Sequence, residues 1–376
     1  MRSTDSRSPL SRILLAFALV VVVVAAAAGC GKSNEPRVSR RENPEKTARS
    51  GEQKKKTAQH EPDFVTGTVV GLSPLTILKV EAGPKSVELM PGGRRVFVND
   101  LYAHKNFIFD ADSYALLKVI PLPDEPVEAD FSPDGRIAWV SLYNSAKVLL
   151  VDVEAGAVIG EVPTGSIPKE VAVSPDGAWV YVANWNSNSV SVIDAKTRTV
   201  VSNIPVPGTP RGICFTPKGD FAYVCIMGGS TLTEVNVAAG HQVSRQIPCG
   251  SNPRHVLITR DGLILYVSNN SPGTVTVVDR VAGAIAATIK VGSQARTIAL
   301  APDERYLFVC NYGEGTVGCV DLQARAQVFK VPASRPIGMV VSAKGDRLFI
   351  SNYAPPQVSI MQIAREPQPA GSAPGP

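Results

Sequence analysis

The sequence predicts an all-β fold, a closed ring of seven four-stranded antiparallel sheets. Three observations predict it: a turn glycine, a proline nine residues before it, and an acidic or amide residue near the end of each unit all recur every 41 to 43 residues. The glycine position holds Gly93, Gly135, Gly177, Gly219, Gly262, Glu304 and Gly345. The proline position holds Pro84, Pro126, Pro168, Pro210, Pro253, Ala295 and Pro336. Markers that keep register over seven units indicate a repeat architecture.

One unit contains four strand patterns in order. EVAVS is apolar and β-branched, and the following SPDG places Ser, Pro, Asp and Gly as a type I turn prefers. AWVYVAN is a second strand, and after the polar loop WNSNS the segment VSVID alternates with period two. AKTR is a turn, and TVVSNIPV is the fourth strand. Four strands in about 42 residues are typical of a β-propeller blade.

The ends of the repeat region predict how the ring closes. The last unit stops after its third strand, QVSIMQI, while residues 68–80 read like the missing fourth strand. We therefore expect this N-terminal strand to complete the seventh blade, because closure removes an open sheet edge.

The motifs carry a family resemblance. YVANWNSNSVSVID, YVSNNSPGTVTVVD and FVCNYGEGTVGCVD resemble the YVTN-type β-propeller repeat, and the resemblance covers residues 66–365. It implies the propeller fold. It says less about activity, since related propellers include surface proteins, binding proteins and some enzymes.

The N-terminus reads as an export signal. Three arginines precede an apolar run at residues 13–28, which is short for a membrane-spanning helix. The AAGC ending resembles a bacterial lipoprotein signal, which implies lipidation of Cys30; an ordinary signal peptide or an uncleaved anchor is the alternative. Gly31 favours the outer membrane or cell surface. We expect a signal at 1–29, a disordered charged tether at 30–63, the propeller at 64–365 and a disordered tail at 366–376.

The charge distribution bears on partners. Residues 1–29 hold three basic and one acidic residue and residues 30–63 hold nine and six, which leaves 26 of each in the remainder. A globular part without net charge argues against a nucleic-acid partner. We expect a monomer attached to the membrane through Cys30.

The strand starts suggest a binding site. In a propeller the first strand of each blade lines the central channel, and five of the seven residues after the marker proline position are basic. They are Lys85, Lys169, Arg211, Arg254 and Arg296. We interpret them, with His255, as a positively charged rim that attracts anions; the alternative is that they pair with Glu128 and Glu170.

Aromatic residues follow the second strand on the same face. They are Tyr143, Trp185, Tyr312 and Tyr353, and asparagines precede three of them. Aromatic faces beside cations suit sugars, nucleobases or peptide side chains. The alternative is structural: the asparagines cap the loops and the aromatics pack between blades.

Conventional catalysis has little support in the sequence. No motif for a metal site, a nucleophile elbow or a phosphate loop is present, and no cofactor is implied. Some propellers that resemble this chain are lactonases, and Glu170, Arg211 and His255 would supply such chemistry here. Five cysteines remain after Cys30, and an odd number does not indicate a disulfide framework. Cys310 and Cys319 lie in one hairpin, and the alternatives for them are a disulfide bridge and two buried thiols.

These patterns favour a non-enzymatic binding or scaffold module. Its partner would be an anionic glycan, peptide or protein at the cell envelope. A lactonase-like hydrolase that uses the central channel is the alternative.

Overall fold

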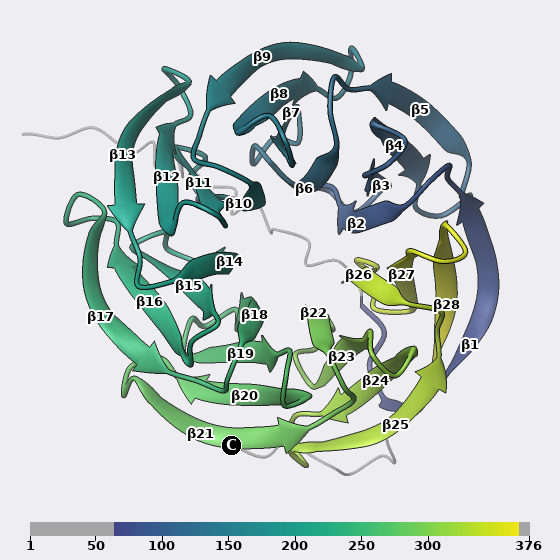
Figure 1. Cartoon of the computed structure of the whole chain (residues 1–376). Coiled ribbons are helices and arrows are strands. Elements are labelled where there is room, and N and C mark those ends of the chain that lie inside the picture. Colours follow the sequence, from purple (N-terminus) through teal and green to yellow (C-terminus); the bar gives the residue numbers. More distant parts are fainter. Residues whose placement is uncertain (1–63, 368–376) are drawn as a thin grey trace, which may run out of the picture. The chain divides into compact units, whose positions relative to one another are not determined.

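The computed structural model describes residues 64–367, which form a ring of seven four-stranded antiparallel sheets (Figure 1). The predicted blade number, strand number and direction are confirmed. The predicted signal peptide at 1–29, the tether at 30–63 and the lipidation site Cys30 lie outside the described residues. So does the predicted tail beyond residue 367.

Each blade starts with an inner strand at the centre of the ring and ends with an outer strand (Figure 1). The first three blades comprise β2 (Pro84–Leu89), β3 (Arg95–Asp100), β4 (Lys105–Asp110) and β5 (Leu116–Pro121); β6 (Pro126–Phe131), β7 (Ile137–Leu142), β8 (Lys147–Asp152) and β9 (Ala157–Pro163); and β10 (Pro168–Val173), β11 (Trp179–Asn184), β12 (Ser189–Asp194) and β13 (Thr199–Pro205).

The next three blades comprise β14 (Thr209–Phe215), β15 (Phe221–Met227), β16 (Thr231–Asn236) and β17 (Gln242–Pro248); β18 (Pro253–Ile258), β19 (Ile264–Asn269), β20 (Thr274–Asp279) and β21 (Ala284–Lys290); and β22 (Ala295–Leu300), β23 (Tyr306–Asn311), β24 (Thr316–Asp321) and β25 (Ala326–Pro332). The seventh comprises β26 (Pro336–Val341), β27 (Arg347–Asn352), β28 (Gln357–Glu366) and β1 (Thr68–Lys79).

The seventh blade closes the ring as the sequence predicts. β1 pairs antiparallel with β28 from Thr68 opposite Glu366 to Lys79 opposite Gln357. Arg347 on β27 reinforces the junction with the first blade, because its Nη1 donates to the Ala111 carbonyl at 2.9 Å. One sheet therefore joins segments that are up to 298 residues apart in the chain, and the buried Arg347 joins residues that are 236 apart.

The turn between the first and second strands shows why the glycine marker recurs. Gly177 adopts a φ of +73°, a left-handed conformation that glycine takes without steric cost. Ser174 Oγ donates to Asp176 and accepts from the backbone N–H of Trp179, which fixes the turn. Glu304 holds the same left-handed conformation at φ +53°, so the repeat geometry prevails where glycine is absent.

The hydrophobic core is divided among the contacts between neighbouring blades. One cluster packs Tyr181 and Ile204 of the third blade against Phe215 and Val224 of the fourth, all largely or fully buried. Each sheet thus buries both faces against its neighbours, and burial of each large aliphatic side chain contributes about 2 kcal/mol.

Cys310 and Cys319 are free, buried thiols. Cys310 lies opposite Val317, and Cys319 lies opposite Phe308, so the two are offset by two residues across the β23–β24 pair. The described part of the chain contains no apolar helix of membrane-spanning length.

Candidate functional site

The ring geometry brings the five basic residues to one place. Each occupies the same position near the start of an inner strand, and the inner strands surround the centre of the ring (Figure 1). Their charges act on one another: the pKa of Arg254 is lowered by burial and by Arg211 and Arg296. We call this group the axial cations: Lys85, Lys169, Arg211, Arg254 and Arg296.

The axial cations are more enclosed than a surface rim would be. Lys85, Lys169 and Arg211 are 7%, 8% and 5% exposed, while Arg254 and Arg296 are half-buried. The predicted rim of cations therefore lies within the ring and has little exposure to solvent. The physical reason is that seven inner strands converge on one axis, so each side chain is covered by those of the other blades.

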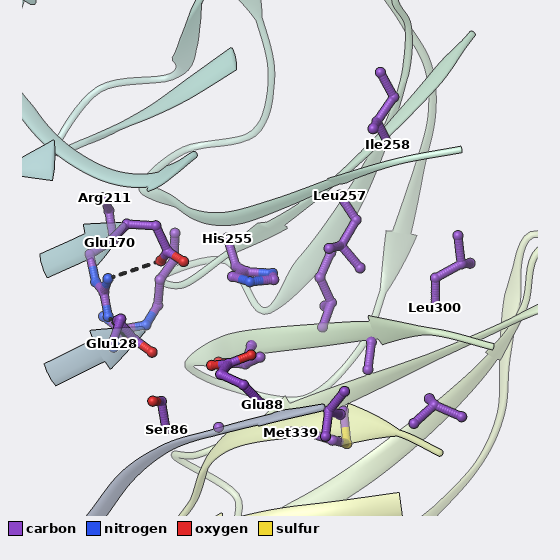
Figure 2. A pocket seen from close by; sticks show the side chains of 17 residues that line it. Ser86, Glu88, Glu128, Glu170, Arg211, His255, Leu257, Ile258, Leu300 and Met339 are labelled. Carbon is purple, nitrogen blue, oxygen red and sulfur yellow. Dashed lines mark hydrogen bonds and ion pairs between the residues drawn. The ribbon is translucent and has the colours of Figure 1, made fainter. Parts of the chain in front are cut away.

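Glu128 on β6 neutralises two of the axial cations. Its Oε1 accepts from Lys85 Nζ at 2.8 Å and from Arg211 Nη2 at 2.9 Å. Glu170 accepts more weakly from Arg211 Nη1 at 3.3 Å (Figure 2). Burial works to raise the pKa of Glu128, but Lys85 and Arg211 outweigh it and bring this pKa down to about 2. Glu128 is therefore held ionised.

Two further carboxyls near the axis are held protonated. Burial, followed by the negative charge of Glu128, raises the pKa of Glu170 to about 8. The same two causes raise the pKa of Glu88 well above its ordinary value. At neutral pH the centre of the ring consequently carries an excess of positive charge.

Three axial cations have no carboxylate oxygen within 4.0 Å among residues 64–367, namely Lys169, Arg254 and Arg296. Two of them lie on aromatic rings instead. Lys169 Nζ is 3.7 Å from the ring centroid of Tyr143, and Arg296 Cζ is 3.5 Å from that of Tyr312. A ring face stabilises a cation only partly when water is excluded, so the charge of Arg296 is left available to an anion.

A pocket of about 340 Å³ opens beside the axial cations. We call it the mouth pocket. It is lined by Lys85, Lys169, Tyr143, Trp185 and Tyr353, together with Leu101, Tyr102, Glu125 and Val127. The structure thus brings together five of the residues that the sequence indicated, and Tyr312 lies next to them with its ring centroid 6.4 Å from that of Tyr353.

Sequence reasoning missed Tyr102 of the mouth pocket. Its ring centroid lies 6.3 Å from that of Tyr353, and its side chain is 60% exposed. Tyr102 lies two residues after the end of β3, whereas the other aromatics lie one residue after their strands. A search of the whole loop between the second and third strands would have found it.

A second cavity of about 290 Å³ extends further along the inner strands (Figure 2). We call it the inner cavity. Glu128, Glu170, Arg211, Arg254 and His255 line one part of it, and Leu257, Ile258, Leu300, Met339 and Val341 line another. Glu88, which sequence reasoning also missed, lies between these parts in Figure 2. It lies two residues after Ser86 on β2, and because alternate residues of a strand share a face, both side chains line the inner cavity.

The inner cavity contains the three residues considered for catalysis. Glu170, Arg211 and His255 all line it, and among these three Arg211 contacts Glu170. Burial lowers the pKa of His255 to about 4, so its imidazole is neutral at pH 7. Within residues 64–367 no cluster of three His, Cys, Asp or Glu side chains has metal-site geometry.

The loop asparagines are structural. Asn184 is fully buried and its Nδ2 donates to Ser191 Oγ at 2.9 Å, and Asn269 donates to Thr276 in the same way at 2.7 Å. A side chain on Gly165 or Gly250 would collide with these amides at less than 3 Å. The asparagines therefore pack the loops and leave the aromatic residues to line the pocket.

Two family models match parts of the chain. The YNCE-like β-propeller model matches residues 172–264, and the model of the cytochrome D1 heme domain matches residues 96–213. The curated proteins gave no match. The haem in the second description is a property of that family.

Solved structures share the fold. A chain of hydrazine synthase from Kuenenia stuttgartiensis matches with a TM-score of 0.70 and 21% identity over 81% of this chain and 100% of that one. The β-propeller domain of Cps50 (Swd1) from Myceliophteria thermophila matches with a TM-score of 0.69 and 12% identity over 78% and 100% of the two chains. The two family models, each matching less than half of the chain, support a β-propeller family, and the two structural matches show the fold alone.

Proposed function

We propose that this propeller is a non-enzymatic binding module that takes the carboxylate of a partner at the axial cations, with the rest of the bound group in the mouth pocket beside them. The observation that carries the proposal is that the axial cations Arg254 and Arg296 have no carboxylate partner within 4.0 Å among residues 64–367. Removing a charge from water is expensive unless an opposite charge meets it. An anionic group at this place would offset that cost, since burial, followed by the charges of Arg211 and Arg296, lowers the pKa of Arg254.

The aromatic walls define what accompanies the anion. Tyr143, Trp185 and Tyr353 present ring faces and edges to the mouth pocket, which suits a sugar ring or a flat peptide side chain. A pocket of about 340 Å³ admits one such group from a larger partner. An acidic peptide segment or a uronic-acid glycan has both features.

The location is proposed from the sequence. The AAGC ending at Cys30 and the basic residues around it support export and lipid attachment of the chain to the cell envelope. A tethered propeller would meet glycans and proteins of the envelope with its mouth pocket.

The Arg254→Gln/Arg296→Gln double variant tests the function. We expect at least a tenfold loss of affinity for a hexaglutamate peptide or a hexagalacturonate, because each charged hydrogen bond contributes about 1.5–3 kcal/mol. Titration calorimetry on the full-length protein measures the affinity, and the two probes distinguish a peptide partner from a glycan. Affinity should also fall as salt is raised.

The matched control replaces two arginines that the axis does not contain. Arg136 and Arg198 are exposed, so Arg136→Gln/Arg198→Gln removes the same net charge from the surface. Equal affinities of the two double variants would show that general electrostatic attraction, and no site at the axis, accounts for the binding.

A lactonase-like hydrolase is the second candidate. The specific observation in its favour is that Glu170, Arg211 and His255 line one cavity beside apolar side chains. Turnover of dihydrocoumarin or γ-butyrolactone that disappears in both His255→Ala and Glu170→Ala would support it. Turnover that persists in both variants would exclude these residues as the catalytic groups.

A further inference from the structure

Lys169 and Lys85 form a natural pair for comparison. They occupy the same position on β10 and β2, both are buried, and both line the mouth pocket. Lys85 Nζ donates to Glu128 at 2.8 Å. Lys169 Nζ makes no hydrogen bond and has no carboxylate oxygen within 4.0 Å among residues 64–367, and it lies 3.7 Å from the Tyr143 ring centroid and 5.0 Å from that of Trp185.

This environment favours the neutral amine at Lys169. Burial, followed by the charges of Arg211 and Lys85, lowers the pKa of Lys169 to about 6. Burial also lowers the pKa of Lys85, but Glu128 opposes it and leaves that value at about 8. At pH 7 Lys169 is therefore mostly an uncharged amine with a free electron pair, while Lys85 is mostly an ammonium.

We propose that Lys169 is a nucleophile that forms a reversible imine with the carbonyl group of a small 2-oxo acid, such as glyoxylate, bound in the mouth pocket. The three elements are an amine without a hydrogen-bond partner, a pocket that reaches it, and cations nearby for the ligand's carboxylate. The proposal rests on the proposed function in one respect, since the pocket must admit an anion.

The step balances without any further reactant. The Nζ electron pair attacks the carbonyl carbon, the carbonyl π pair moves to oxygen, and a proton passes from nitrogen to that oxygen to give a carbinolamine. The hydroxyl then takes up a proton and leaves as water, while the nitrogen pair forms the C=N bond. Nothing is oxidised or reduced, and protons exchange with water through the open pocket. Lysines with lowered pKa values perform such chemistry in other proteins.

Reductive trapping tests the proposal on the full-length protein. Glyoxylate and sodium cyanoborohydride at neutral pH convert an imine into a stable carboxymethyl-lysine, which peptide mass spectrometry locates. We expect Lys169 to be labelled about tenfold faster than Lys85, because that is about the ratio of their neutral fractions at pH 7. Lys169→Arg should abolish this fast labelling, and Lys196→Arg, at an exposed position outside the pocket, should leave it unchanged.

Glycolate, which has the carboxylate but no carbonyl, separates the two proposals. If glycolate binds at the axial cations but Lys169 is labelled no faster than Lys85 or the exposed Lys196, the imine is wrong and the binding function stands. If neither glycolate binding nor fast labelling occurs, both proposals are wrong. The labelling rates of Lys169, Lys85 and Lys196 are compared within the wild-type protein, so the result does not depend on whether any variant folds.

Discussion

Deletion of residues 68–79 is expected to unfold the whole propeller in a single transition at a much lower temperature. β1 pairs with β28 along its length, and it buries Val69 and Leu78. Loss of the strand removes the ladder and the apolar burial together, which we expect to cost more than about 4 kcal/mol. It also leaves β28 as an open edge that invites aggregation. Calorimetry of the full chain and of the truncated chain measures the effect.

The control keeps the strand and changes its exposed side chains. Leu75 and Ile77 on β1 are each 48% exposed, so Leu75→Thr/Ile77→Thr should shift stability by no more than about 1 kcal/mol. A truncated chain that melts at the same temperature as the control would show that the ring is closed by contacts other than β1.

The fold could be predicted from the sequence because the strand and turn patterns of each blade lie within one repeat of about 42 residues. The turn at Gly177 requires a residue with a left-handed backbone conformation. The same turn can be recognised in the other blades because the glycine, proline and aspartate markers recur at fixed spacing. Even Glu304 could be placed, since the repeats on both sides fix its register. The missing fourth strand of the last blade predicted the pairing of β1 with β28 for the same reason.

The candidate site was predictable only in part. Position within the repeat correctly brought Lys85, Lys169 and the aromatic residues to one end of the inner strands. It could not show that Glu128 would pair with both Lys85 and Arg211, because these residues come from three different blades. Which cations are left without a partner depends on side-chain distances across the axis, and no local pattern encodes them.

Glu128→Gln is expected to destabilise the propeller by about 3 kcal/mol at neutral pH. The substitution leaves Lys85 and Arg211 buried without their shared carboxylate, and loss of one partner of a buried ion pair typically costs about 3–5 kcal/mol. Glu170 offsets part of this loss, because without the charge of Glu128 its pKa falls and it can ionise beside Arg211. Urea unfolding monitored by circular dichroism gives the difference in free energy.

Glu170→Gln is the matched control, since Glu170 occupies the same position in the next blade. Glu170 is already protonated at neutral pH, and glutamine resembles a protonated glutamate, so the loss at pH 6 should be below about 1 kcal/mol. Equal losses in the two variants would contradict the assignment of the negative charge to Glu128.

The pH dependence of the two variants should have opposite signs. The pKa of Glu128 falls from an ordinary value of 4.5 to about 2 on folding, so its stabilisation is complete above pH 4.5 and disappears as pH falls toward 2. The pKa of Glu170 rises to about 8, so the wild type loses stability as pH rises from 4.5 to 8 while Glu170→Gln does not. The Glu128→Gln deficit should therefore vanish in acid, and Glu170→Gln should gain on the wild type toward pH 8. A deficit that persists at pH 2 would mean that Glu128 stabilises the ring through packing, and the ionised state assigned to Glu128 would be wrong.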